Sequence, residues 1–323
     1  MNVTAITVTY GNRAKFVKEV IFSCLSQNIK KIIIIDNGSP NENYEYLKKL
    51  QSQFPSEIGV YHSHKNEGSA LGFKKGILLA EEQSDKDSWF LLLDDDNSLV
   101  DGALDALKNA IELNDSHERN AYLCLRKDRS QYLNFLASED DTDILGVTDS
   151  FLGFSIWQSI KRKFDKKKYS SSVIPNKIVN CPCGPYGGLF FHRKIVDAIG
   201  YPNEKLFLYS DDTEYTLRLR QNDINLWLVS SALISDIDES WSNIKSKKKI
   251  SSPLFETQDY KIYYSIRNRI YLERKYLVNN YFIYVCNIIS SLTILTVKAL
   301  LCSSFRKLIL IYKSIYDGFW FKI

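Results

Sequence analysis

The chain has 323 residues, of which 45% are hydrophobic and 25% are charged, and its formal net charge is +4. This size and composition support one large domain with an appendage, or two smaller domains. Because positive and negative charges nearly balance, the chain lacks the strongly basic field of many nucleic-acid-binding proteins, and we expect no nucleic-acid partner. The N-terminus enters a predicted strand with no basic region or long apolar segment before it, so we expect no secretory signal and a cytoplasmic protein.

Strands and helices alternate along the first third of the chain. Short apolar runs rich in β-branched residues predict the strands, and apolar residues at helical spacing predict the helices between them. This alternation predicts an α/β fold with a mostly parallel sheet and helices on both faces. The predicted strands are residues 3–9, 31–35, 58–62 and 89–93, and the helices include residues 16–25, 43–53, 68–82 and 103–111.

The pattern changes in the second third of the chain. Between about residues 130 and 176 it decays into charged and Ser-rich sequence, which predicts a flexible insertion beside the active site. Order returns with a Gly-rich turn and apolar strand over residues 184–192, an acidic helix over residues 211–221 and a strand over residues 226–229. We therefore expect a catalytic domain over residues 1–240, followed by a helical region over residues 241–323.

Three consecutive carboxylates, Asp94, Asp95 and Asp96, follow directly on the apolar run of residues 89–93. They lie at the C-terminal end of a predicted buried strand, where α/β sheets bind ligands. Carboxylates this close repel one another unless a cation lies between them, and oxygen ligands suit Mg²⁺ or Mn²⁺. An acidic turn that caps the next helix would have the same composition, so the triplet alone leaves both interpretations open.

Further polar loops follow the other predicted strands. Residues 9–13 follow the first strand and residues 36–39 the second, and both loops should meet the Asp triplet at one edge of the sheet. There the ring of Tyr10 and the carboxylate of Asp36 could bind a nucleoside. Residues 64–69 form a turn into a helix N-terminus, which is a ready place for phosphate. Each loop alone could be an ordinary turn.

In their order and spacing these segments resemble the family 2 glycosyltransferases, which are inverting enzymes with a GT-A fold that use nucleotide-sugars. The resemblance covers about residues 3–240 and is most specific for the branch that holds bacterial galactofuranosyl- and rhamnosyltransferases. The matching segments are residues 7–13 (TVTYGNR), 36–38 (DNG), 66–68 (NEG), 72–73 (GF), 94–96 (DDD) and 206–215 (LFLYSDDTEY) with Arg218. Beyond that region, residues 263–268 (YYSIRN) and 316–318 (YDG) also resemble the branch.

The resemblance implies a role for each matching residue. Asp94 and Asp96 would bind Mn²⁺ or Mg²⁺, and Asp95 would face the nucleotide-sugar. Asp212 would be the base that deprotonates the acceptor hydroxyl; because Asp211 points about 100° away on a helix, only one of the two should reach the acceptor. Without the resemblance, these acids would be read as an ordinary acidic helix start. The other implied residues are Thr9, Tyr10, Arg13 and Asp36 around the nucleotide, Asn66 near the diphosphate, and Glu214 among the catalytic acids.

One departure from the branch concerns the metal. Its members often place a His about twenty residues after the acidic helix as a further metal ligand. Residues 231–238 read SALISDID and contain no His. Asp236 could replace it and give an all-oxygen site, or it could be a loop residue that faces solvent.

The implied function is transfer of a sugar from UDP-galactofuranose, another UDP-hexose or dTDP-rhamnose to a glycan or lipid-linked saccharide acceptor, in bacterial surface polysaccharide synthesis. Residues 1–128 would form the nucleotide-sugar half and residues 177–240 the acceptor half. A sugar nucleotidyltransferase is one alternative, although those enzymes usually carry a Gly-rich loop and residues 10–13 contain one glycine. An inactive membrane-bound scaffold with the same fold is another.

The C-terminal segment is strongly apolar. Residues 281–302 contain 16 apolar residues in 22, enough to suggest a membrane span. Asn287, Ser291 and Lys298 fall on one helical face, which favours an interfacial helix, or one packed on the catalytic domain, over a span. Because residues 305–316 combine basic and apolar side chains, we expect peripheral attachment to the inner face of the cytoplasmic membrane. A homo-oligomer formed through these helices is the alternative.

Overall fold

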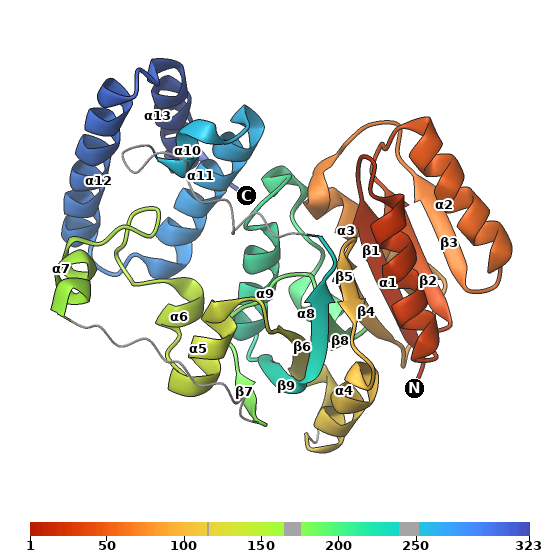
Figure 1. Cartoon of the computed structure of the whole chain (residues 1–323). Helices are drawn as coiled ribbons and strands as arrows, with labels where there is room; N and C mark the ends of the chain where they lie inside the picture. The colour runs from red at the N-terminus through yellow and green to blue at the C-terminus, as the bar shows by residue number, and fades with distance from the viewer. Residues whose placement is uncertain (115, 165–175, 239–251) are drawn as a thin grey trace. The chain divides into compact units, whose positions relative to one another are not determined.

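The computed structural model describes residues 1–114, 116–164, 176–238 and 252–323 (Figure 1). The chain divides into two compact units. The first comprises residues 1–144, 171–207 and 211–239, and the second comprises residues 145–170, 208–210 and 240–323. The chain therefore passes between the units several times along its length.

The first unit is built on one mixed sheet of nine strands in the order β3-β2-β1-β4-β8-β6-β9-β5, with β7 paired to β9. The strands β3, β2, β1 and β4 are parallel to their neighbours, and so are β6 and β9, whereas β8 runs antiparallel to both β4 and β6. The strands are β1 (Val3–Thr9), β2 (Lys31–Asp36), β3 (Ile58–His62), β4 (Trp89–Asp94), β5 (Asn97–Leu99), β6 (Asn120–Arg126), β7 (Ile178–Asn180), β8 (Leu189–His192) and β9 (Asn225–Asp236).

Helices cover both faces of this sheet because its central strands are apolar on both sides. One apolar cluster joins α1, α2 and α4 to one face, and a second joins α3, α5, α8 and α9 to the other. The α/β fold class with a mostly parallel sheet between helices is confirmed. These helices are α1 (Ala14–Ser26), α2 (Asn41–Gln53), α3 (Gly68–Glu82), α4 (Ala103–Glu112), α5 (Ser130–Ser138), α8 (Ile195–Ile199) and α9 (Asp211–Gln221).

The strand register brings the predicted polar loops to one edge of the sheet. Thr9 at the end of β1 pairs with Asp36 at the end of β2, and Val8 pairs with Asp94 at the end of β4. On the other side of β8, the parallel strands β6 and β9 end at Arg126 and Asp236. The C-terminal ends of the parallel strands therefore carry both acidic and basic side chains.

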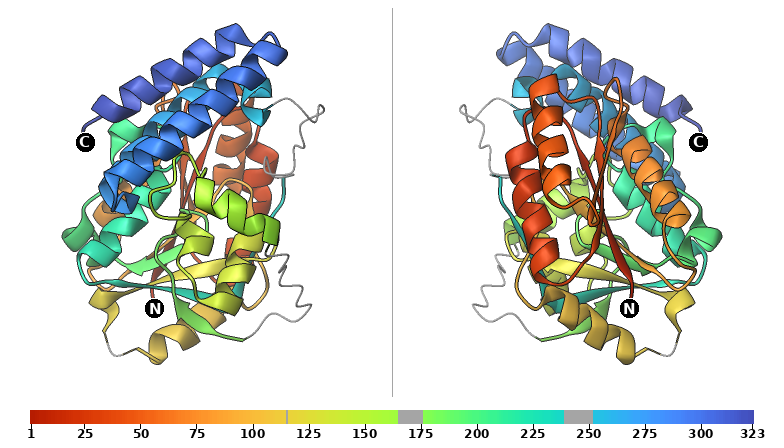
Figure 2. Two further views of the ribbon diagram at one scale, coloured as in Figure 1. Left: turned by 90° about the vertical axis from the view of Figure 1, so that its left-hand side faces the viewer. Right: turned by 90° about the vertical axis from the view of Figure 1, so that its right-hand side faces the viewer.

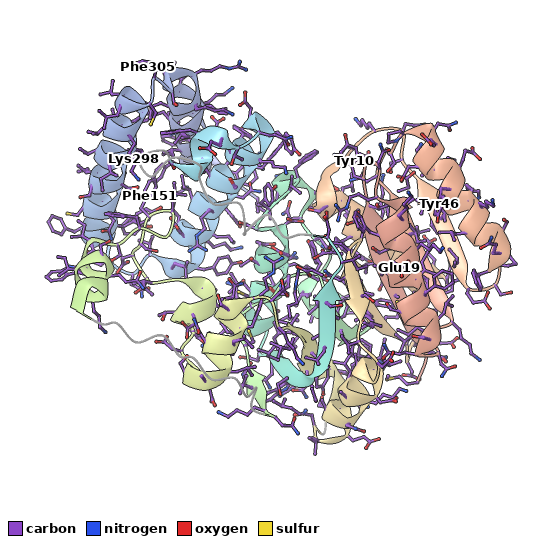
Figure 3. The ribbon with its side chains drawn as sticks, in the orientation of Figure 1. Tyr10, Glu19, Tyr46, Phe151, Lys298 and Phe305 are labelled. Carbon is purple, nitrogen blue, oxygen red and sulfur yellow. The ribbon has the colours of Figure 1, made fainter. Side chains whose placement is uncertain are left out.

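The second unit is helical. Its core contains Phe151, Tyr284 and Ile311, and the rings of Phe151 and Tyr284 meet with centroids 5.9 Å apart (Figure 3). The helix α11 continues into one turn of π-helix over Glu273–Leu277. Besides α11 (Asp259–Leu272), the helices of this unit are α7 (Ile156–Phe164), α10 (Pro253–Glu256), α12 (Tyr281–Leu301) and α13 (Phe305–Trp320).

The segment predicted as a flexible insertion contains regular structure. Its residues 130–164 include α5, the short helix α6 (Thr142–Leu145) and α7, while residues 165–175 lie outside the described residues. Residues 145–170 group with the C-terminal helices rather than with the sheet. The predicted boundaries of a catalytic domain at 1–240 and a helical region at 241–323 stay a prediction.

Candidate functional site

Arg13 binds two carboxylates that follow β4 and one that follows β9. Its Nε donates to Asp95 Oδ1 at 2.9 Å, and its two terminal nitrogens reach Asp96 Oδ2 and Asp238 Oδ2, each at 2.7 Å. The hydroxyl of Thr9 also donates to Asp95 Oδ2, at 2.8 Å. A planar guanidinium with five N–H donors suits such a bridging position. The structure thus brings together four residues of the predicted site: Thr9, Arg13, Asp95 and Asp96.

A second basic group binds Asp236 at the end of β9. Arg126 and Arg129 both donate to its carboxylate, Arg129 at 2.8 Å, and Asn97 Nδ2 donates to the same carboxylate at 2.9 Å. Burial alone would raise the pKa of Asp236, but the two arginines hold it below its usual value. Both oxygens of Asp236 are engaged by donors, and its predicted metal role stays a prediction.

The carboxylates of the triplet are only partly neutralised by these arginines. Burial raises the pKa of Asp94 to about 7, although Arg126 lies 3.4 Å from its carboxylate and opposes the shift. Burial raises the pKa of Asp95 to about 6 against the effect of Arg13, and it also raises the pKa of Asp96. A further cation at this site would therefore be favourable.

The donor atoms near Asp94 suit a hard divalent cation. Asn97 Oδ1 is buried and has no hydrogen-bond partner among the described residues. A Cβ built on Gly187 would lie 2.1 Å from this oxygen and 2.7 Å from Asp94 Oδ2, so the two oxygens converge beside a glycine that leaves them room. Among the residues that the structure describes, no three His, Cys, Asp or Glu side chains form a metal-binding group. Mg²⁺, however, commonly takes one or two protein carboxylates and completes its shell with substrate phosphates and water, so the oxygen donors fit.

The predicted nucleoside loops differ in how far their side chains are engaged. Asp36 is fully buried; it accepts from Ser39 N at 3.1 Å and lies 2.7 Å from His62 Nδ1. The side chain of Asn66 accepts from the backbone N–H of Gly68 at 2.9 Å, at the start of α3. Tyr10 follows β1 and is 50% exposed, so its ring is free to stack on a planar ligand (Figure 3).

The first two residues of the acidic helix α9 differ in burial and in hydrogen-bond partner. Asp211 is buried, and its Oδ2 accepts from the Ser69 hydroxyl at 2.7 Å. Asp212 is partly exposed, and its Oδ1 accepts from Thr213 N at 2.6 Å. Burial raises the pKa of both carboxyl groups, and the charge of Asp212 raises the pKa of Asp211 further. Glu214 is buried and lies 3.2 Å from Arg218 one turn further along the helix, so it is paired within α9.

The turn that leads into α9 has an unusual backbone. Phe207, Tyr209 and Ser210 have φ values of 65°, 65° and 59°, in the left-handed region that non-glycine residues rarely adopt. In the first unit, Phe207 O accepts from Ala70 N at 3.3 Å, next to the Ser69 that binds Asp211. Left-handed residues persist only where surrounding contacts hold them. The start of α3 therefore holds the chain in place directly before the two aspartates.

Gly68 permits this close approach, which gives a stability prediction. Its φ is +83°, and an added Cβ would lie 2.1 Å from Phe207 O. Gly68→Ala should lower the free energy of unfolding by about 2–4 kcal/mol, since backbone strain and a steric overlap add together. Gly102 is a matched control, because its φ is +81° and a Cβ there would meet nothing within 4 Å. Gly102→Ala should cost about 1 kcal/mol in the same urea titration; equal losses would contradict the close packing of Gly68 on Phe207.

Sequence reasoning missed several residues of this site. Arg126, Arg129 and Asn97 contact the predicted acids, but none belongs to a segment that was given a binding role. Ser69 lies in the segment 64–69, which was predicted as a place for phosphate, but its contact with Asp211 was not predicted. The position of Arg126 could have been noticed in the sequence. It stands at the end of the largely apolar run 120–126, just as Asp94 stands directly after the apolar run 89–93. That run was not recognised as a strand.

Comparison with known proteins identifies a family. The family described as glycosyl transferase family 2 matches residues 4–176, which is more than half of the chain. A search of functionally curated proteins found no match.

Two solved structures share the fold. GalNAc-T7, crystallised with UDP, GalNAc and Mn²⁺, has a TM-score of 0.56 and 13% sequence identity, over 84% of this chain and 47% of that chain. The mannosyltransferase PcManGT from Pyrobaculum calidifontis, in complex with GDP-Man and Mn²⁺, has a TM-score of 0.53 and 12% identity, over 100% of this chain and 76% of that chain. The chain thus spans less than half of GalNAc-T7, and at these identities the likeness shows the fold.

Proposed function

The chain belongs to glycosyl transferase family 2, and we propose that it transfers a sugar from a nucleoside diphosphate sugar to an acceptor hydroxyl, with inversion at the anomeric carbon. One observation supports this proposal: the segment 184–187 joins the first turns of α9 to the end of β4. Thr216 of α9 accepts from Gly184 N at 3.0 Å and donates to Gly184 O at 2.9 Å, and a Cβ built on Gly187 would lie 2.7 Å from Asp94 Oδ2. The residues proposed for the donor and the residue proposed as the base thus serve a single centre.

The donor side of the site is assigned to the loops after β1, β2 and β4. The exposed ring of Tyr10 would stack on the base, and Asp36 would accept from the nucleoside. Arg13 and Thr9 hold Asp95 by hydrogen bonds and would fix this carboxylate beside the nucleotide-sugar. Asn66, at the start of α3, would lie near the diphosphate, where the helix N-terminus also favours negative charge.

A divalent cation is part of the proposal. Two proteins of similar fold were crystallised with Mn²⁺, and Asp94 and Asp96 supply carboxylates that suit Mn²⁺ or Mg²⁺. Such an ion, when bound, would neutralise the charge that develops on the departing nucleoside diphosphate. Asp236 is the candidate for a third ligand, although Arg126 and Arg129 already hold its carboxylate.

Asp212 is proposed as the general base. It is partly exposed, and its raised pKa favours proton uptake from an acceptor hydroxyl near neutral pH. Asp211 would act as a positioning residue, because its buried carboxylate binds Ser69 at the start of α3. Glu214, paired with Arg218, would hold the first turns of α9 together.

We further propose that the chain belongs to the galactofuranosyl- and rhamnosyltransferase branch. Two segments that carry this resemblance, residues 263–268 and 316–318, contact each other, since Tyr263 donates to Asp317 at 2.8 Å. The donor would then be UDP-galactofuranose, another UDP-hexose or dTDP-rhamnose. The acceptor would be a glycan or lipid-linked saccharide of a bacterial surface polysaccharide. The helical region 241–323 would keep the enzyme at the inner face of the cytoplasmic membrane; a homo-oligomer is the alternative use of these helices.

A donor screen tests the function. The purified chain should bind one UDP- or dTDP-sugar in the presence of Mn²⁺. A free donor concentration 100 times the dissociation constant should raise the free energy of unfolding by about 2.7 kcal/mol, which is measured as a raised thermal midpoint. It should then release the nucleoside diphosphate from that donor. Release of pyrophosphate from a nucleoside triphosphate and a sugar phosphate would instead indicate a nucleotidyltransferase. Absence of any donor binding would favour the inactive scaffold.

A further inference from the structure

The second unit exposes large apolar side chains on three of its helices. We call this the apolar helix surface and define it by Trp157 and Ile160 of α7, Phe282 and Ile289 of α12, and Ile309 and Trp320 of α13. Trp157 is 71% exposed, Phe282 78% and Ile309 70%. In the left view of Figure 2, α12 and α13 run side by side, and α7 lies on the same side of the unit. Exposed apolar patches of this extent mark a contact with a partner or a membrane.

The helix α12 differs from an ordinary surface helix in which side chains it buries and which it exposes. Its polar residues Asn287 and Ser291 are buried, whereas Phe282 and Ile289 face outward. The Asn287 amide donates to Asp149 O at 2.7 Å and accepts from the N–H of Ile156, the first residue of α7, at 3.0 Å. The inner face also contributes Tyr284 and Ala299 to the core of the second unit, so α12 is apolar on both faces, whereas a helix on a water-facing surface has a polar outer face. The outward face of α12 is therefore suited to an apolar environment.

The charges around the surface indicate what that environment is. Residues 281–323 contain five basic residues, Lys298, Arg306, Lys307, Lys313 and Lys322, and one acidic residue, Asp317. Arg306 and Lys307 both pair with Asp259 of α11, at 3.2 and 2.5 Å, so their charge is partly compensated within the unit. In α7, Lys161 adds a further basic residue. Lys298 lies in the last turn of α12, and Phe305 is the first residue of α13; both are labelled in Figure 3. Anionic lipids attract basic clusters of this kind, whereas a second copy would bring like charges together.

The contacts of α12 within the second unit favour a helix that lies in the membrane interface over one that spans the bilayer. Among the described helices, α12 is the one that is long and apolar enough to cross a membrane. Its opposite face, however, is bound within the second unit: besides the contacts of Asn287, the Tyr284 hydroxyl donates to buried Glu273 at 3.1 Å. A spanning helix would have to break these hydrogen bonds, whereas a helix lying in the interface keeps them.

We propose that the apolar helix surface binds an anionic phospholipid bilayer in the plane of its headgroups, and that α7 inserts Trp157 and Ile160 as part of it. Sequence reasoning predicted attachment through the helical region 241–323 and placed α7 in an insertion beside the active site. The inference deepens the proposed function, on which it rests, by naming a lipid surface as partner. The paired helices and α7 together would hold the enzyme where a lipid-linked acceptor lies.

Sedimentation with vesicles tests the proposal without any nucleotide-sugar. The full chain should bind phosphatidylcholine vesicles that contain phosphatidylglycerol at least ten-fold more strongly than pure phosphatidylcholine vesicles, and high salt should reduce the difference. The double variant Trp157→Gln, Ile160→Ser should lower the partition coefficient at least ten-fold, since two apolar side chains no longer enter the bilayer. Leu113→Gln is the matched control, because Leu113 is 75% exposed on the first unit and should leave binding unchanged.

The possible results separate the alternatives. Unchanged vesicle binding by the α7 variant, with an unchanged circular dichroism spectrum, would overturn the role of α7. A lipid-free dimer that the same variant converts to a monomer, without loss of vesicle binding, would show that the surface joins two copies of the chain. Donor cleavage with a water-soluble acceptor should be the same in the variant and the wild type, so a failure of lipid binding is distinguishable from a failure of the proposed function.

Discussion

Asp212→Asn should lower sugar transfer by roughly 10²–10⁴-fold, the usual contribution of general base catalysis, while binding of the nucleotide-sugar is retained. Asparagine keeps the shape of the side chain and can still accept from Thr213 N, the contact that orients Asp212 at the start of α9. It cannot take a proton from the acceptor at neutral pH. The measurement is single-turnover transfer at saturating donor, with donor affinity determined separately by calorimetry.

Asp211→Asn is the matched control for this experiment. Asp211 is buried and bonded to Ser69 Oγ, and the amide oxygen of asparagine can accept the same hydrogen bond. We therefore expect a smaller loss of transfer than for Asp212→Asn. A larger loss in the Asp211 variant, or near-wild-type transfer by the Asp212 variant, would assign the base to the other carboxylate.

Asp96→Ala should abolish divalent-dependent donor binding and leave the fold intact. The expected loss of Mn²⁺-dependent affinity for UDP or dTDP is at least about 100-fold, because even the residues that orient metal ligands are typically worth 10–100-fold. The fold should survive because Arg13 keeps its contacts with Asp95 and Asp238 when Asp96 is removed. Calorimetry with and without Mn²⁺ measures the metal-dependent and the metal-independent affinity for the nucleotide.

Asp105→Ala is the control for the metal prediction. Asp105 lies on α4 and is paired with Lys108 on the protein surface, so removing it changes the net charge by the same amount away from the site. Its Mn²⁺-dependent nucleotide affinity should equal that of the wild type. If the Asp96 variant also kept its affinity, the metal assignment to the triplet would be wrong.

The strands of the parallel half could be predicted because a run of consecutive apolar residues is typical of a strand buried on both faces. Residues 31–35 were predicted as a strand and Lys31–Asp36 is one, since four consecutive isoleucines there are buried between two layers of helices. The strand β6 was missed, although all seven of its residues are buried. Short apolar runs are ambiguous between helix and strand, and β6 is defined by its pairing with β8 and β9 far along the chain.

The same limit applied to the site. The acidic residues could be found because they follow strands, but their partners could not. Arg126 and Arg129 bind Asp236 across 110 and 107 residues of sequence, and no local pattern predicts such pairs. In the C-terminal segment, helical spacing did predict that Asn287 and Ser291 share a face. Spacing could not show that this face is buried, because that depends on Asp149 and Ile156 in a distant segment.

The division of the chain into interleaved units has a consequence for how the protein is made. Phe151 packs against Tyr284 in the C-terminal helices. The backbone oxygen of Asp149 accepts a hydrogen bond from Asn287, which is synthesised 138 residues later. At about 5–20 residues per second, a ribosome needs roughly 7–28 s to synthesise that stretch. During this interval residues 145–164 have left the ribosome without their core, and a nascent chain should be cleaved there by a protease that spares the finished protein. Only synthesis of α12 removes that vulnerability, so a fragment that stops at residue 240 would carry it permanently.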